Sequence, residues 1–134
     1  MKSESNIMKA AMMAASKLGC KIFRVNVGRA WAGNDIKKLP DGSMLIRDPR
    51  PFKTGVPKGY PDLTGFVPVT ITPDMVGKKI AMFVAFETKT AVGRATPAQM
   101  NFLGAVADAG GVAGIVRSDD DVVRAINALN NSDV

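Results

Sequence analysis

An acidic and a basic residue stand two positions apart at the end of a strongly apolar segment. Residues 80–86 are apolar without interruption, which is typical of a central strand covered on both faces. Glu87 and Lys89 follow this segment, and because side chains alternate along a strand, both are expected on one face of the sheet. A carboxylate beside an ammonium group at the end of a buried strand is well placed for chemistry. The same pair also occurs as an ordinary ion pair.

Two further motifs flank this segment. A loop rich in glycine and proline leads to residues 59–65, which read Gly-Tyr-Pro-Asp-Leu-Thr-Gly and open a second apolar stretch. Beyond Lys89, residues 93–99 read Gly-Arg-Ala-Thr-Pro-Ala-Gln. Asp62 and Glu87 are separated by 24 residues. Each motif alone is weakly specific, whereas three of them in this order are strongly specific.

Together the three motifs resemble the virus-type replication-repair nuclease (VRR-NUC) family of the PD-(D/E)xK nucleases. That family has a G-x-P-D-L-x-G block, a strand ending in E-x-K and a G-R-x-[ST]-x-x-Q block, and the resemblance covers residues 3 to 125, roughly. It implies an α/β fold with a central mixed β-sheet flanked by helices, in the order αβββαβ. One departure is Thr88, where the family usually has an apolar residue. A β-branched side chain on the opposite face should be tolerated there.

A metal site is the chemistry that this resemblance implies. Two carboxylates brought close together repel each other unless a cation lies between them, and ligation by oxygen alone favours Mg²⁺ or Mn²⁺. We expect Asp62 and Glu87 to bind this ion, helped by the backbone carbonyl of Thr88. Lys89 is expected to hold the attacking water or to offset the charge that grows on the phosphate.

Three other residues in this resemblance have two interpretations each. Glu4 matches an acidic residue on the family's first helix that reaches the metal or a second one, and alternatively it interacts only with the helix dipole. Gln99 is expected to orient Lys89 or a water, and alternatively it only completes a helix capping box. Arg94 contacts a substrate phosphate or is a solvated loop arginine.

The composition excludes several other kinds of site. The chain has 134 residues, which suits one domain spanning residues 1–134. Without histidine and with a single cysteine, Cys20, it cannot form a zinc site of the usual ligands, a histidine-dependent triad or an internal disulfide. A lone cysteine fits a reducing cytoplasm. No apolar segment is long enough to cross a membrane, and the N-terminus lacks the features of a signal peptide.

Positive charge is concentrated in one part of the chain. The net charge is +6, and residues 20–60 hold nine Lys and Arg against three Asp, whereas the remaining residues hold nine of each sign. This segregation predicts a surface that faces DNA, with a merely solvated basic face as the alternative. Trp31 in this segment either stacks on a base or packs against the core. The expected DNA-binding residues are Arg24, Arg29, Lys37, Lys38, Arg47, Arg50, Lys53, Lys58 and, by resemblance, Arg94.

Hydrophobic periodicity and turn signals predict an α/β sandwich around a mixed sheet. Helices are predicted over residues 3–18, from Thr96 towards Gly110, and over 122–129 after the cap at 118–121. Strands are predicted over residues 20–27, 44–47, 63–69, 80–86 and 112–116. Residues 28–38 are predicted to be irregular, residues 40–43 a turn and residues 49–61 a loop.

The resemblance implies a divalent-metal-dependent, structure-selective DNA endonuclease that hydrolyses phosphodiester bonds in branched DNA, as a Holliday-junction resolvase does. Stand-alone members of this size look like phage or bacterial proteins that act on four-way junctions. Symmetric cutting of a junction needs two active sites, which predicts a two-fold homodimer. The alternatives are a flap nuclease of the same fold and a non-catalytic basic DNA-binding module. An RNA-binding fold is not supported, because the sequence contains no RNP-like pattern.

Overall fold

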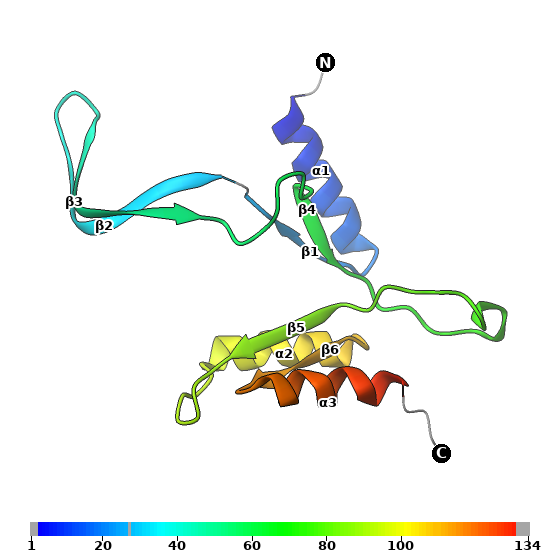
Figure 1. Ribbon diagram of the computed structural model, residues 1–134. Coiled ribbons are helices and arrows are strands. Elements are labelled where there is room, and N and C mark those ends of the chain that lie inside the picture. Colours follow the sequence, from blue (N-terminus) through cyan, green and yellow to red (C-terminus); the bar gives the residue numbers. More distant parts are fainter. Residues whose placement is uncertain (1–2, 27, 131–134) are drawn as a thin grey trace. The chain divides into compact units, whose positions relative to one another are not determined.

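The chain folds into two units. A computed structural model describes residues 3–26 and 28–130 (Figure 1). Of these described residues, unit 1 takes in those up to 15 and those within 22–64, and unit 2 takes in residues 16–21 and those from 65 to 130. The mixed α/β class predicted from the sequence is confirmed, with elements in the order α1 (Glu4–Lys17), β1 (Lys21–Arg24), β2 (Arg29–Lys38), β3 (Met44–Lys53), β4 (Leu63–Phe66), the 3₁₀ helix η1 (Pro73–Met75), β5 (Val84–Thr88), α2 (Pro97–Asp108), β6 (Val112–Val116) and α3 (Asp119–Asn130).

The ends of α1 follow from residues next to them in the sequence. Ser3 Oγ accepts a hydrogen bond of 3.2 Å from the Asn6 N–H, so Ser3 caps the helix. Gly19 follows the last turn with a φ of 86°, a left-handed conformation that glycine adopts without strain. Within residues 3–26 and 28–130, none of the helices combines the length and the apolar character needed to cross a membrane.

The strands pair as three two-stranded sheets in the described part of the chain, rather than as the single central sheet expected from the sequence. β1 pairs with β4, β2 with β3 and β5 with β6. β1 and β4 are shorter than the strands predicted over 20–27 and 63–69. Pro68, just beyond β4, has no N–H to extend its pairing, and Val27 lies outside the described residues.

The longest strands lie where the sequence predicts mostly irregular backbone. β2 and β3 pair antiparallel from Arg29 opposite Lys53 to Lys38 opposite Met44, joined through the predicted turn at residues 40–43. The prediction of irregular backbone over 28–38 is therefore wrong, and so is the start of the predicted loop, because residues 49–53 belong to β3. Residues 54–61 form a loop, as predicted. Residues 33–35 have low β-propensity, but register shifts on both sides of Asn34 absorb them while the flanking residues keep their cross-strand partners.

β5 begins later than the apolar run suggests. Its ladder with β6 starts at Val84 opposite Val112 and ends at Thr88 opposite Val116. Residues 80–82, predicted as the start of this strand, have no partner strand among the described residues, and Phe83 shares one hydrogen bond with Val112 just before the ladder begins. A strand extends only as far as its neighbour supplies hydrogen bonds, which explains why the hydrophobic pattern alone misplaced its start.

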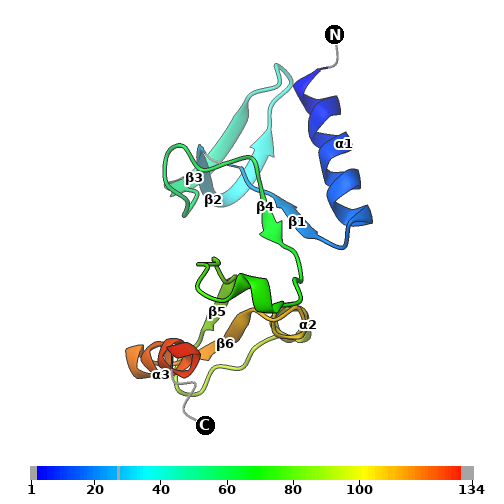
Figure 2. The ribbon, with the colours of Figure 1, turned by 90° about the vertical axis from the view of Figure 1, so that its right-hand side faces the viewer.

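Unit 2 has three layers. α2 connects the parallel strands β5 and β6, as the crossover between parallel strands requires, and the β5–β6 sheet lies between α2 and α3 (Figure 2). Leu103 and Val106 of α2 and Val116 of β6 are the buried apolar side chains of the described residues. The core that holds the end of β5 in place therefore lies between α2 and the sheet.

Gly111, between α2 and β6, fits only because it has no side chain. A Cβ there would lie 2.7 Å from Val106 Cγ1 and 2.8 Å from the carbonyl oxygen of Phe83. Such overpacking typically costs about 1–3 kcal/mol, so we expect Gly111→Ala to lower the free energy of unfolding by about that amount. Gly104→Ala is the matched control, because a Cβ at this α2 position meets nothing within 4 Å and should stabilise the helix by about 0.5–1 kcal/mol. Thermal unfolding followed by circular dichroism measures both, and equal shifts of the two variants would contradict this account.

Candidate active site

Glu87 and Lys89 lie side by side at the end of β5, as the period of a strand predicts. Lys89 Nζ is 3.4 Å from Glu87 Oε1, and their side chains are 21% and 30% exposed. This partial burial strengthens the interaction relative to an ion pair in open solvent. The arrangement satisfies both interpretations of the pair, an ion pair at a strand end and a catalytic carboxylate beside an ammonium group.

Gln99 joins this pair from the first turn of α2. Thr96 caps that helix, with its Oγ1 accepting from the Gln99 N–H at 3.2 Å and its own N–H donating to Gln99 Oε1 at 2.9 Å. The predicted capping box is thus confirmed. The other end of the same amide, Nε2, donates to Glu87 Oε1 at 2.9 Å. The cap fixes Gln99, and Gln99 orients Glu87 rather than Lys89.

The two donors contact only one of the two oxygens of the Glu87 carboxylate. Gln99 Nε2 and Lys89 Nζ both approach Oε1, whereas Oε2 has no hydrogen bond to the described residues. Glu87 and Gln99 line a cavity of about 520 Å³ between β5 and α2, together with apolar side chains that include Phe86 and Phe102. An oriented carboxylate with a free oxygen in such a cavity can bind a cation or accept a proton.

The backbone of β5 also presents unused groups along one edge. The Val112 N–H donates to the Phe83 carbonyl, and the Lys89 N–H donates to the Val116 carbonyl. Both bonds use odd-numbered residues of this segment, and backbone groups alternate sides along a strand. The N–H and carbonyl of Thr88 therefore point away from β6, towards an edge that has no partner among the described strands. This carbonyl is the one predicted above as a metal ligand, and that role stays a prediction.

Asp62 and Glu4 lie in unit 1, whereas Glu87 lies in unit 2. Asp62 directly precedes β4 with an exposed side chain, and its carbonyl accepts from the Val25 N–H at 2.8 Å. Glu4 is the exposed first residue of α1, where the helix dipole favours an acid. The metal-binding roles of both residues stay predictions.

The donor atoms at hand fit a hard cation. Among residues 3–26 and 28–130, no three His, Cys, Asp or Glu side chains gather into one metal-binding group. The Glu87 carboxylate and the Thr88 carbonyl are both oxygen donors, and water and phosphate oxygens complete the shell of Mg²⁺ in many proteins. The residues present in unit 2 thus suit Mg²⁺ or Mn²⁺ as a partly solvated ion.

Arg117 is a residue of this region that the sequence analysis missed. Its Nη1 donates to the carbonyls of Thr90 and Gly93, the second at 2.8 Å. Its backbone N–H donates to Asp121 Oδ2 at 2.8 Å, and this bond, together with the charge of Arg124, lowers the pKa of Asp121. Arg117 therefore ties the start of α3 to the turn that follows Lys89.

A signal for Arg117 exists in the sequence. It directly follows the predicted strand at residues 112–116, and parallel strands that end together place the next residues of both side by side. The register confirms this, since Val116 lies opposite Thr88. Arg94 follows the turn that Arg117 holds, and its side chain is exposed, as either interpretation of this residue requires.

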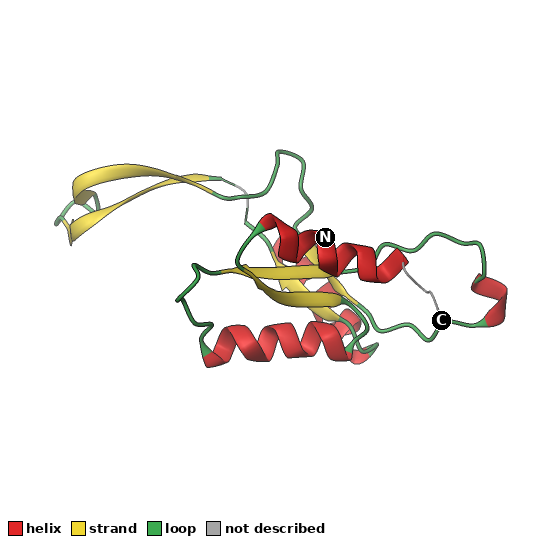
Figure 3. Ribbon diagram, turned by 60° about the horizontal axis from the view of Figure 1, so that its bottom comes forward, coloured by secondary structure: helices red, strands yellow, loops and turns green. Residues whose placement is uncertain are grey.

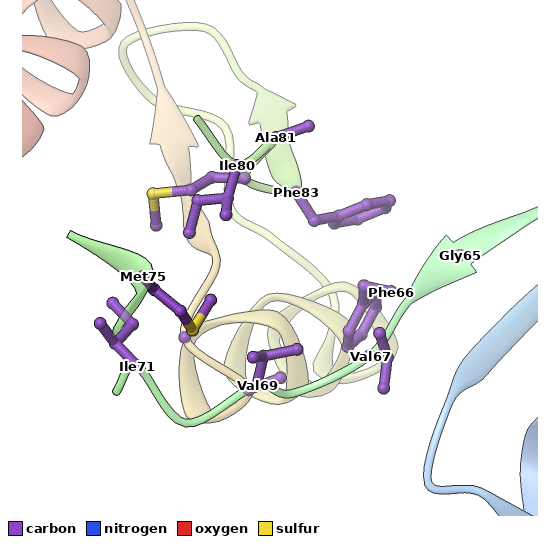
Figure 4. Close-up of a pocket in the computed structure, with 12 residues that line it drawn as sticks. Gly65, Phe66, Val67, Val69, Ile71, Met75, Ile80, Ala81 and Phe83 are labelled. Carbon is purple, nitrogen blue, oxygen red and sulfur yellow. The ribbon is translucent and has the colours of Figure 1, made fainter. Parts of the chain in front are cut away.

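A second cavity of unit 2 is apolar. It has a volume of about 550 Å³ and is lined by residues of the 65–83 segment and by Ala109 and Gly110. Figure 4 shows side chains such as Phe66, Ile71 and Phe83 around it. No charged residue lines this cavity, so the cavity beside Glu87 is the better candidate for chemistry on a phosphate.

Six of the predicted DNA-binding residues lie on the paired strands β2 and β3 of unit 1. All six are exposed: Arg29, Lys37, Lys38, Arg47, Arg50 and Lys53. Arg24 ends β1, and Lys58 lies in the loop before β4, both also exposed. Their contacts with DNA stay predictions, but six of the nine predicted residues lie on this one pair of strands.

Comparison of the chain with protein-family models, with curated proteins and with solved structures finds no match.

Proposed function

We propose that this protein is a divalent-metal-dependent nuclease that hydrolyses phosphodiester bonds in branched DNA. The observation that carries the proposal is the state of Glu87: Gln99 and Lys89 hold one carboxylate oxygen, and the other is left for a ligand. An ion pair that served stability alone would not need a glutamine from the first turn of α2 to orient its carboxylate. Supporting a metal ligand in this way is typical of metal sites.

In this proposal Mg²⁺ or Mn²⁺ would be held by Glu87 and the Thr88 carbonyl, with Asp62 as a further ligand, as the resemblance to the PD-(D/E)xK nucleases implies. When bound, the ion would polarise the phosphodiester and lower the pKa of a bound water. Lys89 would donate hydrogen bonds to the attacking water or to the phosphate oxygens, whose negative charge grows during the reaction. Gln99 would keep Glu87 in place.

DNA would be bound through the basic residues of β2 and β3, with Arg94 contacting a phosphate next to the scissile one. These contacts are sequence-independent, which suits an enzyme that selects a DNA shape. A two-fold homodimer would supply the two active sites that symmetric cutting of a four-way junction requires. Glu4 would add a carboxylate from the start of α1.

The test is cleavage of labelled DNA of defined shape. We expect a four-way junction or a flap to be cut in Mg²⁺ or Mn²⁺, linear duplex to be cut less, and EDTA to abolish all cleavage. Asp62→Asn should weaken Mg²⁺ binding in calorimetry, because it removes one of the two proposed carboxylate ligands. Tight binding of the junction with no cleavage in any divalent metal would refute the nuclease and favour a non-catalytic DNA-binding module.

A further inference from the structure

The β2–β3 ribbon carries an aromatic side chain next to a pair of cations on one face. Pairs in an antiparallel ladder alternate between a type that exchanges hydrogen bonds and a type that does not, and side chains lie closer in the second. The Thr54 N–H donates to the Gly28 carbonyl, so the next pair, Arg29 with Lys53, is of the second type. Pro51, opposite Trp31, lies in the next pair of this second type. Residues of such a pair exchange no hydrogen bonds, so the absence of an N–H at Pro51 agrees with this alternation.

Residues directly opposite each other share a face of the ribbon. Arg29, Trp31, Pro51 and Lys53 therefore lie on one face, which we call the Trp31 face. Ala30, Ala32, Arg50 and Phe52 lie on the other. Trp31 is 63% exposed, and Pro51 lies opposite it in the ladder.

The charges of the Trp31 face lack an internal counterion. Arg29 and Lys53 stand directly opposite each other in a pair of the closely spaced type, and like charges in such positions destabilise a sheet. No acidic residue lies in the paired segments 29–32 and 50–53. An anion bound between the two cations would offset this repulsion, so the Trp31 face favours the binding of a phosphate.

Both outer edges of the β2–β3 ribbon are unpaired in the described part of the chain. β2 and β3 pair with each other and with no third strand among the described residues, as Figure 3 shows for the long pair of yellow strands. Pro49 and Pro51 stand in β3, and proline blocks the addition of a further strand along the edge to which its missing N–H would point. These prolines thus keep a further strand from pairing along that edge of β3, and Trp31, on the face of the ribbon, is exposed.

We infer that the Trp31 face binds an unpaired nucleotide of single-stranded DNA. The base stacks on Trp31, while Arg29 and Lys53, which form the next pair on the same face, bind the backbone phosphates beside it. Stacking of this kind needs an exposed base face, which single strands offer and a continuous duplex does not. The inference rests on the proposed function only for the choice of DNA as ligand, and it adds that the branched substrate has unpaired nucleotides.

Trp31 is the only tryptophan in the sequence, so its fluorescence reports on this face alone. The experiment uses the full chain in EDTA, where no cleavage takes place, with a short oligothymidylate and a blunt duplex of equal length as probes. We expect saturating oligothymidylate to quench the fluorescence strongly and the duplex to quench it weakly. Equal quenching by both probes, or no quenching by the single strand, would overturn the inference.

Variants on the two faces of the ribbon give the matched comparison, with binding measured by anisotropy of the labelled oligothymidylate. Trp31→Ala should raise Kd by about 5- to 100-fold, and Trp31→Phe by less, because phenylalanine retains a ring. Phe52→Ala removes an aromatic side chain that is 54% exposed on the opposite face and should leave Kd within about twofold. If Phe52→Ala and Trp31→Ala weaken binding equally, the assignment to the Trp31 face is wrong.

The salt dependence tests the two cations. Arg29→Ala and Lys53→Ala should each reduce the slope of log K against log salt concentration by about 0.7, the value for one phosphate contact with a single strand. Lys78→Ala, an exposed lysine of unit 2, should leave the slope unchanged. Unchanged slopes for both ribbon variants would refute the phosphate contacts. Quenching of Trp31 fluorescence by the single strand, without metal-dependent cleavage of any DNA, would refute the proposed nuclease function but support this inference.

Discussion

Lys89→Ala is expected to reduce metal-dependent DNA cleavage by about 100- to 1000-fold, the usual loss when one donor aimed at developing charge is removed. Its ammonium group lies 3.4 Å from Glu87 Oε1 at the end of β5, where a phosphate held by the same metal would be within reach. Affinity for uncleaved DNA in EDTA should change little, since the basic ribbon of unit 1 supplies most of the proposed phosphate contacts. Initial rates on the preferred branched substrate measure the loss.

Stability and a second lysine provide the controls for this result. An ion pair that is partly exposed contributes at most about 1 kcal/mol, so the thermal unfolding of Lys89→Ala should stay close to that of the wild type. Lys79→Ala removes an equal charge from an exposed position outside β5 and should cleave normally. Cleavage by Lys89→Ala at the wild-type rate would leave the Glu87–Lys89 contact as an ion pair without a catalytic role.

The parts of the fold that the sequence predicts well are those that neighbouring residues decide. The N-cap at Ser3, the capping box of Thr96 and Gln99 and the stop at Gly19 each depend on residues within about one helical turn. The strand at 112–116 was also predicted with its observed bounds. In these cases no distant partner is needed to determine the structure.

Distant partners explain what the sequence did not predict. The β2–β3 ribbon depends on pairing between segments on either side of residues 40–43, and this pairing outweighs the poor β-propensity of residues 33–35. The start of β5 depends on where β6 begins. Alternation along a strand predicts that Glu87 and Lys89 meet, but the contact of Gln99 with Glu87 requires the chain to turn back through residues 90–95. Arg117, which follows the C-terminal end of β6, contacts the same turn.

Gln99→Ala is expected to lower cleavage by about 10- to 100-fold, the range typical for residues that orient a metal ligand. The variant loses two interactions at once. Its side chain no longer accepts from the Thr96 N–H, which weakens the cap of α2, and it no longer donates to Glu87 Oε1. The loss of the cap should cost about 1 kcal/mol of stability, whereas the loss of the second bond leaves the Glu87 carboxylate free to rotate.

Thr96→Ala separates these two effects. It removes the other half of the same capping box, the bond from the Gln99 N–H to Thr96 Oγ1, and keeps the Gln99 side chain that contacts Glu87. Both variants should therefore unfold at similarly reduced temperatures, but only Gln99→Ala should cleave slowly at a temperature where both are folded. Mg²⁺ titration followed by calorimetry gives an independent measurement, with weaker binding expected for Gln99→Ala alone. If the two variants lose cleavage in equal measure, Gln99 acts only through the stability of α2, and the case for an oriented carboxylate in this cavity fails.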